Sequence, residues 1–166
     1  MATIYISIGS NINPQQNIQL ALRDLREHFQ NIRLSSSYES KAVGFEGDNF
    51  INLVAAAETD LKIPQVVQLF HDIEDQHGRD RQGPRFSSRT IDLDLLLYDN
   101  AVFTQDGIEI PREEILQNAF VLCPLAELLP DGVHPVTGKR YDELWASFDQ
   151  SSQPLWRIDD MPLTVK

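Results

Sequence analysis

The sequence predicts an α+β fold in which a mostly antiparallel sheet is packed against helices. Two segments with apolar residues at helical spacing alternate with four β-rich segments, in the order βαββαβ. This order is typical of the ferredoxin-like, split βαβ arrangement, which carries its helices on one face of the sheet. The chain has 166 residues, which fits a single domain over 1–166 at roughly 100–200 residues per domain.

The first three elements lie between residues 4 and 39. Residues 4–8 are β-rich and are followed by the turn cluster Gly9-Ser10-Asn11. Apolar residues then recur at helical spacing over 14–29, directly after an Asn-Pro pair that is typical of a helix start. A second strand is predicted for 32–39.

The next three elements complete the pattern. A loop over 41–48 leads to a third strand at 50–57. A second helix begins at Pro64 and ends at Gly78, where a glycine suits the C-terminal cap. A long polar loop then leads to a strong strand at 90–98.

The last third of the chain is less regular and forms a C-terminal extension. It holds a predicted turn at Asp106-Gly107, a helical piece near 112–118 and an apolar run over 119–129.

Composition excludes several classes of function. The net charge is −11, from 25 acidic and 14 basic residues, which argues against general binding to nucleic acid or to anionic membranes. The single cysteine, Cys123, allows no internal disulfide and fits a reducing compartment. No signal-peptide pattern opens the chain, and no apolar run approaches the roughly 20 residues that cross a bilayer. We therefore expect a cytoplasmic protein, acting as a monomer or a weak homo-oligomer.

A local cluster of positive charge stands out against the acidic background. Four arginines fall within eleven residues, at Arg79, Arg81, Arg85 and Arg89. Such a cluster is compatible with a solvated loop paired to nearby acids. It is also the pattern of an anion site, because the planar guanidinium grips phosphate oxygens in pairs and keeps its proton.

A pair of carboxylates follows this loop on the predicted strand. Strand side chains alternate between faces, so Asp92 and Asp94 share one face, about 7 Å apart, while Ile91, Leu93, Leu95 and Leu97 share the other. An ordinary strand with a polar outer face has the same pattern. However, Mg²⁺ takes one or two protein carboxylates together with substrate phosphates. Arginines beside such a pair form the combination that phosphoryl transfer needs.

Three aromatic residues and one amide suggest a place for a flat heterocycle. Phe50, Phe86 and Phe120 fit either the core or a stacking surface. Asn52 shares the face of Phe50 on a predicted strand, where a buried amide needs a partner with donors and acceptors.

These motifs resemble those of the 6-hydroxymethyl-7,8-dihydropterin pyrophosphokinase family of folate biosynthesis. Gly78-Arg79-Asp80-Arg81, followed by Arg89-Thr90-Ile91-Asp92-Leu93-Asp94, resembles its signature. Gly9-Ser10-Asn11, Phe50-Ile51-Asn52 and the stretch from Phe120 to Glu127 are similar to its other blocks, in the same order. The resemblance covers about residues 3–130.

The resemblance implies a ferredoxin-like fold and a defined reaction. Pyrophosphate passes from ATP, the co-substrate, to the hydroxymethyl group of the pterin, and AMP is released. Asp92 and Asp94 would hold two Mg²⁺ ions, with Asp92 also near the pterin. Arg79, Arg81 and Arg89 would grip the phosphates as catalytic residues, and Glu74 matches a position near the nucleotide. The pterin pocket implied in this way consists of Val43, Gly44, Phe50, Asn52, Phe86, Asp92 and Phe120.

The sequence departs from the family pattern in two places. Phe86-Ser87-Ser88 stands where the family commonly has Trp-Gly-Pro, so Phe86 keeps an aromatic side chain at the first of these positions. Arg112, Glu113 and Asn118 stand where a histidine, an aromatic or small residue and an arginine are common, with Arg112 as a partial replacement in nucleotide binding. The leading hypothesis is an active pyrophosphokinase. The departures motivate an alternative, a catalytically weak pterin-binding or regulatory paralogue. An unrelated metal enzyme, such as a nuclease or glycosyltransferase, leaves the arginine loop unexplained.

Overall fold

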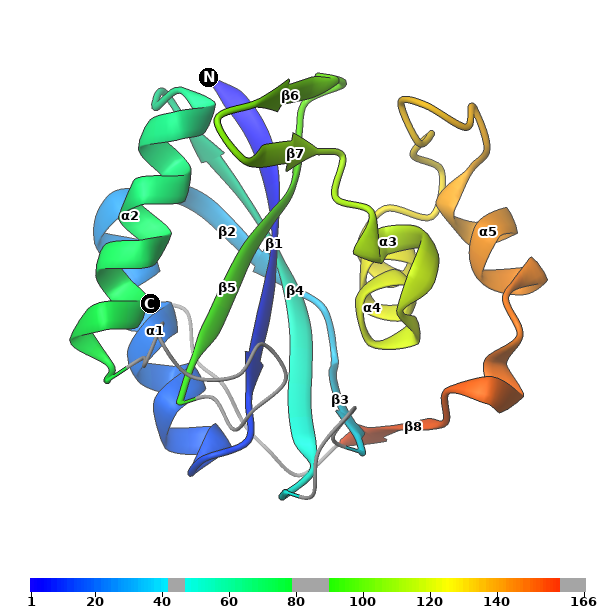
Figure 1. The fold of residues 1–166 in the computed structure, drawn as a ribbon, viewed down its shortest axis with the longest axis horizontal. Coiled ribbons are helices and arrows are strands. Elements are labelled where there is room, and N and C mark those ends of the chain that lie inside the picture. The colour runs from blue at the N-terminus through cyan, green and yellow to red at the C-terminus, as the bar shows by residue number, and fades with distance from the viewer. Residues whose placement is uncertain (42–46, 79–89, 159–166) are drawn as a thin grey trace.

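A computed structural model describes residues 1–41, 47–78 and 90–158. Its main sheet has six strands, in the order β5-β1-β4-β3-β8, with β2 also paired to β4 (Figure 1). Each of these pairings is antiparallel, which confirms the predicted α+β sheet. The strand bounds are β1 (Ala2–Ser10), β2 (Gln30–Leu34), β3 (Ser37–Ser40), β4 (Phe50–Thr59), β5 (Asp92–Tyr98) and β8 (Leu155–Ile158).

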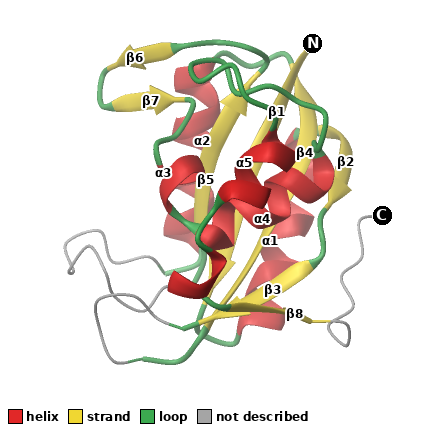
Figure 2. Ribbon diagram, turned by 90° about the vertical axis from the view of Figure 1, so that its right-hand side faces the viewer, coloured by secondary structure: helices red, strands yellow, loops and turns green. Residues whose placement is uncertain are grey.

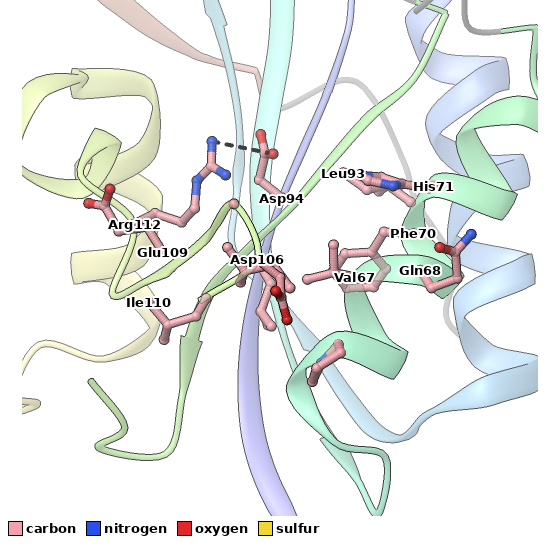
Figure 3. A pocket seen from close by; sticks show the side chains of 14 residues that line it. Val67, Gln68, Phe70, His71, Leu93, Asp94, Asp106, Glu109, Ile110 and Arg112 are labelled. Carbon is pink, nitrogen blue, oxygen red and sulfur yellow. Dashed lines mark ion pairs between the residues drawn. The ribbon is translucent and has the colours of Figure 1, made fainter. Parts of the chain in front are cut away.

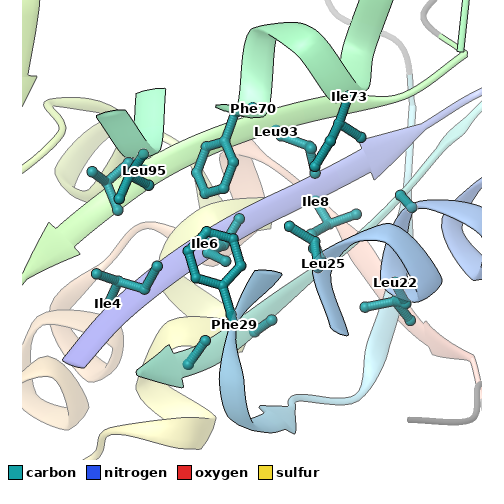
Figure 4. Close-up of a cluster of buried hydrophobic side chains, with 14 of the residues drawn as sticks. Ile4, Ile6, Ile8, Leu22, Leu25, Phe29, Phe70, Ile73, Leu93 and Leu95 are labelled. Atoms are coloured by element: carbon teal, nitrogen blue, oxygen red, sulfur yellow. The ribbon is translucent and has the colours of Figure 1, made fainter. Parts of the chain in front are cut away.

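Two long helices cover one face of the sheet, as predicted. These are α1 (Pro14–His28) and α2 (Ile63–Gln76), and each has a proline in its first turn. Their apolar stripes pack on the β1 side chains Ile4, Ile6 and Ile8 in one continuous core (Figure 4). Phe29, at the end of α1, meets Phe70 of α2 edge to face, with 6.0 Å between the ring centroids.

The opposite face of the sheet is also covered by helices, which the expected one-sided arrangement did not include. There α4 (Ala119–Leu128) lies on the strands, on the side opposite α1 and α2, and α5 (Tyr141–Ser147) packs against α4 (Figures 1 and 2). The reason is that β1 and β4 are apolar on both faces. Tyr5 and Val54 point away from the first core and pack with the helices of the second.

The predicted second strand, 32–39, is two strands in the structure. β2 and β3 both pair with β4, but the strand conformation is interrupted between them at Ser35 and Ser36. The Ser35 hydroxyl accepts a hydrogen bond from the Val54 N–H at 2.9 Å, and Ser36 N–H donates to Glu127 Oε2 of α4 at 2.8 Å. One backbone bond to β4, from the Ser35 N–H to Val54 O at 2.9 Å, remains at this point, and the two side-chain bonds supplement it.

The C-terminal extension supplies a hairpin, three further α-helices, a short 3₁₀ turn and an edge strand. β6 (Phe103–Gln105) and β7 (Ile108–Ile110) form the hairpin. Its two turn residues, Asp106 and Gly107, have φ of 55° and 78°, which confirms the predicted turn and fits a type I′ geometry. After α3 (Glu114–Gln117), α4, α5 and a short 3₁₀ turn (Gln150–Ser152), β8 returns to pair with β3. In the part of the chain described, no helix is long and apolar enough to span a bilayer.

Candidate active site

One row of residues crosses four neighbouring strands on the face that α4 covers. Asp92 of β5 lies opposite Gly9 of β1, Gly9 lies opposite Asn52 of β4, and Asn52 lies opposite Tyr38 of β3. In the next row, Asp94 lies opposite Ser7. The fold therefore brings the carboxylate pair and Asn52 onto the same face, two strands apart.

The two aspartates share a face because β5 is regular up to Leu95. Ile91, Leu93 and Leu95 point into the first core, as predicted. The expectation for Leu97 is wrong, because the β1–β5 register shifts between Tyr5 and Ile6 and leaves Leu97 opposite Tyr5 in the second core. An irregularity of this kind turns the side chains that follow it onto the other face.

Gly9 leaves room for the Asn52 side chain. A Cβ atom at Gly9 would stand 2.5 Å from Asn52 Oδ1, so the amide lies over the glycine, on the side of β5. Asn52 is buried, and no acceptor in the described residues bonds its Nδ2. Because buried donors are almost always bonded, this atom indicates a place for a ligand. The cluster Gly9-Ser10-Asn11 is thus not a simple turn, since β1 continues through Ser10.

The carboxylate pair is electrostatically strained. Desolvation by the surrounding protein, followed by the charge of Asp92, raises the pKa of Asp94 to about 8, although Arg112 opposes the shift. A hard divalent cation relieves such repulsion, so the donor set fits Mg²⁺. Among the described residues, no group of three or more His, Cys, Asp or Glu side chains is placed to hold a metal.

Glu74 is buried next to the backbone of β5 and is not exposed beside the carboxylate pair. Its side chain is 2% exposed, and Oε2 accepts a hydrogen bond from the Leu93 N–H at 2.8 Å. Leu93 stands between the two aspartates on β5, an edge strand of the sheet whose outward N–H groups need partners. Glu74 of α2 thereby fixes the backbone that carries both carboxylates.

Arg112 approaches the pair from the segment after the hairpin. Its backbone N–H donates to Leu96 O of β5 at 3.1 Å. The guanidinium donates two hydrogen bonds to Glu114, at 3.0 and 2.8 Å, and its Nη2 lies 3.6 Å from Asp94 Oδ1. The sequence pattern drew attention to Glu113 as a departure from the family and missed Glu114. In the structure, the exposed Glu113 accepts a hydrogen bond from Gln117, and the Asn118 carbonyl caps the first turn of α4.

A cavity of about 350 Å³ opens between α2 and the β6–β7 hairpin. Figure 3 shows Asp94 and Arg112 at one side of it, with Val67 and Phe70 of α2 across from them. Its volume falls in the range of small-molecule sites. No local pattern could reveal it, because its walls come from segments that are far apart in the sequence.

The predicted aromatic residues that the structure describes lie around the Asn52 row. Phe50 begins β4 on the face of Asn52, and Phe120 lies in α4, which covers that face; both are half-buried. Glu127 holds α4 in place by accepting the Tyr38 hydroxyl at 2.6 Å and the Ser36 N–H. The other predicted site residues fall outside the described parts of the chain: Val43, Gly44, Arg79, Arg81, Phe86 and Arg89.

Comparisons with known proteins agree on one family. Residues 5–130 match the model of the family described as 7,8-dihydro-6-hydroxymethylpterin-pyrophosphokinase. The chain is 33% identical to the 2-amino-4-hydroxy-6-hydroxymethyldihydropteridine pyrophosphokinase of Aquifex aeolicus, over 86% of this chain and 90% of that protein. It is 34% identical to the enzyme of the same name from Haemophilus influenzae, over 81% of this chain and 86% of that protein.

Solved structures show the same fold in a longer protein. A Plasmodium falciparum HPPK-DHPS triple mutant crystallised with SDX-DHP matches with a TM-score of 0.70 at 12% identity. The match covers 87% of this chain but only 44% of that one. The sequence motifs, the family model and the relatives lead to one conclusion: the chain belongs to the 7,8-dihydro-6-hydroxymethylpterin pyrophosphokinase family.

Proposed function

We propose that Asp92 and Asp94 hold two Mg²⁺ ions for the reaction of this pyrophosphokinase. The reaction transfers pyrophosphate from ATP to the hydroxymethyl group of 6-hydroxymethyl-7,8-dihydropterin and releases AMP. The observation that carries the proposal is the row in which Asp92, Gly9 and Asn52 lie side by side on three strands. It supports a metal–phosphate centre next to a heterocycle site. The pairing of β8 with β3 supports one catalytic domain.

Asn52 is the centre of the proposed pterin site. Its Oδ1 accepts hydrogen bonds and its unpaired Nδ2 donates, so the amide can bind the mixed donor and acceptor edge of a pterin. Phe50 and Phe120 would stack on the flat ring. Val43, Gly44 and Phe86 would complete the pocket. Because β1 lies between β4, which carries Asn52, and β5, which carries Asp92, the two residues are two strand spacings apart, and the pterin would lie about 10 Å or less from the metal pair.

The cavity between α2 and the hairpin is the proposed place for the base of ATP. Asp94 and Arg112 border it, so phosphates that leave the cavity on this side pass directly to the carboxylate pair. Arg112 would bind phosphate oxygens there, together with Arg79, Arg81 and Arg89. Glu74 would act on the nucleotide indirectly, through the backbone of β5 that it holds.

The chemistry that follows is mainly a matter of position. The pterin hydroxyl oxygen attacks the β-phosphorus of ATP and gives up its proton to solvent. The bond from that phosphorus to the α,β-bridging oxygen breaks, and AMP leaves with this oxygen. Bound Mg²⁺ supplies polarisation of the phosphoryl oxygens. Asn52 and the aromatic residues hold the acceptor on one side, and the arginines hold the donor on the other, so that attack and departure are in line.

A product analysis tests this function. When the protein is incubated with Mg²⁺, ATP and 6-hydroxymethyl-7,8-dihydropterin, we expect AMP and the pterin diphosphate in equal amounts by ion-exchange chromatography. Without the pterin, ATP should remain intact. Release of ADP in place of AMP, or a folded protein that binds the pterin and forms no AMP at any ATP concentration, would contradict the proposal.

A further inference from the structure

We propose that Arg112 serves as the counter-ion of Asp94 in the nucleotide-free protein. Its guanidinium then turns from Asp94 to a phosphate oxygen when metal and nucleotide bind, and Glu114 keeps it within reach of both positions. This inference rests on the proposed function, because it assumes that Asp94 is a metal ligand.

The geometry shows that Glu114, rather than Asp94, fixes the guanidinium. Arg112 makes two hydrogen bonds to Glu114, at 3.0 and 2.8 Å, in the paired geometry that carboxylates favour. Its distance to Asp94, 3.6 Å, is longer than a hydrogen bond and leaves only the attraction of opposite charges. Leaving Asp94 therefore breaks no hydrogen bond, so the guanidinium can change partner while Glu114 still holds it.

The charges explain why Asp94 needs a counter-ion before metal arrives. Asp94 shares one face of β5 with the carboxylate of Asp92, and the Arg112 guanidinium, with Nη2 3.6 Å from Asp94 Oδ1, places a positive charge beside it. A divalent cation on Asp94 takes over this role and repels the guanidinium at the same time. The backbone bond from Arg112 to Leu96 of β5 keeps the side chain at the edge of the cavity, where nucleotide phosphates would pass.

The side chains have the access that an exchange of partners requires. Arg112 is 31% exposed, Asp94 36% and Glu114 28%, so water and ligands reach all three. Within the described residues, Arg112 Nη1 has no hydrogen-bond partner, which leaves this donor for a phosphate oxygen.

Two titrations with opposite expected signs test the inference. In the first, Mn²⁺ alone is titrated into the protein without nucleotide, at a pH above the pKa of Asp94 so that its carboxylate is charged, and is followed by electron paramagnetic resonance. Arg112→Gln should bind Mn²⁺ about two- to fivefold more tightly, because the competing charge is gone. Glu114→Gln should bind it more weakly, because the guanidinium then has only Asp94 as its partner. In the second titration, Arg112→Gln should bind magnesium and α,β-methylene-ATP about tenfold more weakly by calorimetry.

Matched controls separate this mechanism from a loss of structure. Arg140 donates to Asp142 with the same two-residue spacing and paired geometry, at 3.1 and 2.7 Å, away from the cavity. Arg140→Gln should change neither titration. Arg112→Lys keeps the charge and should bind Mn²⁺ like the wild type.

The outcomes also distinguish the inference from the function it rests on. If Asp94→Asn removes Mn²⁺ binding but Arg112→Gln leaves it unchanged or weaker, the counter-ion role is wrong and the metal pair stands. If Asp94→Asn leaves Mn²⁺ binding intact, the metal pair itself is wrong and the inference falls with it.

Discussion

Replacing Asp94 with asparagine is expected to lower the rate of pyrophosphoryl transfer roughly a thousandfold or more. The amide keeps the shape of the side chain but loses the negative charge with which Asp94 would hold the proposed Mg²⁺ ion. Since Asp94 and Asp92 lie on one face of β5, the loss of either charge disrupts the alignment of the phosphates. The measurement is the steady-state rate of AMP formation at saturating ATP and pterin.

The same substitution should leave the fold intact, and this separates a catalytic defect from unfolding. The folded protein raises the pKa of Asp94 to about 8, whereas the unfolded chain ionises an aspartate at about pH 4. Between these two pKa values the unfolded state binds fewer protons than the folded state. The stability of the metal-free protein therefore falls as pH rises through this range. Asp94→Asn removes this loss of stability. At a pH above the pKa of Asp94, the Tm of the variant should equal or exceed that of the wild type.

Asp131→Asn is the matched control for both measurements. Asp131 is 87% exposed and pairs with Arg140 in the C-terminal extension. Its substitution should change neither the rate nor the Tm. An Asp94→Asn protein with wild-type activity, or one that is inactive because it melts at a lower temperature, would contradict the account of the carboxylate pair.

Replacing Gly9 with alanine is expected to weaken pterin binding about tenfold to a hundredfold. The added Cβ would stand 2.5 Å from Asn52 Oδ1, a distance that real atoms do not adopt, so the Asn52 amide must move. A displaced amide can no longer meet the edge of the pterin, whose polar groups then lose their partners. Fluorescence titration of the pterin measures the dissociation constant.

Two further variants show whether the Asn52 amide is the cause. Gly132→Ala creates a comparable clash, at 2.4 Å from Leu129 Cγ, but away from the site. It should lower stability without changing the dissociation constant of the pterin. Asn52→Ala should bind the pterin as weakly as Gly9→Ala, and the Gly9→Ala, Asn52→Ala double variant should be no weaker than either. Full additivity of the two losses would show that Gly9 does not act through Asn52.

The order of helices and strands along the first 98 residues could largely be predicted from the sequence because local patterns set it. Alternating and continuous apolar runs marked β1, β4 and β5, and helical spacing marked α1 and α2. The break at Ser35 could not be predicted, since it depends on Ser36 meeting Glu127, which lies 91 positions further along the chain. The two apolar faces of β1 indicated that both sides of the sheet are covered. The ferredoxin-like order of elements, with helices on one face only, does not account for the second helical layer.

The candidate site, too, could be predicted from the sequence only in part. Strand alternation is enough to predict that Asp92 and Asp94 share a face, and that Asn52 shares one with Phe50. The part that Gly9 plays needs the register of three strands, because only there does Asn52 lie over it. Glu114 and the cavity beside α2 depend on tertiary contacts, so no motif predicts them.

The most direct test of the central claim measures how close the metal pair and the pterin site are. Mn²⁺ with α,β-methylene-ATP is added to the protein–pterin complex, and the line widths of the pterin hydroxymethyl protons are followed by NMR. Because Asp92 and Asn52 are two strands apart in one row, about 10 Å, we expect strong broadening. The broadening should disappear in Asp94→Asn. Sharp signals from the hydroxymethyl protons of a bound pterin, with Mn²⁺ also bound at the aspartates, would contradict the account.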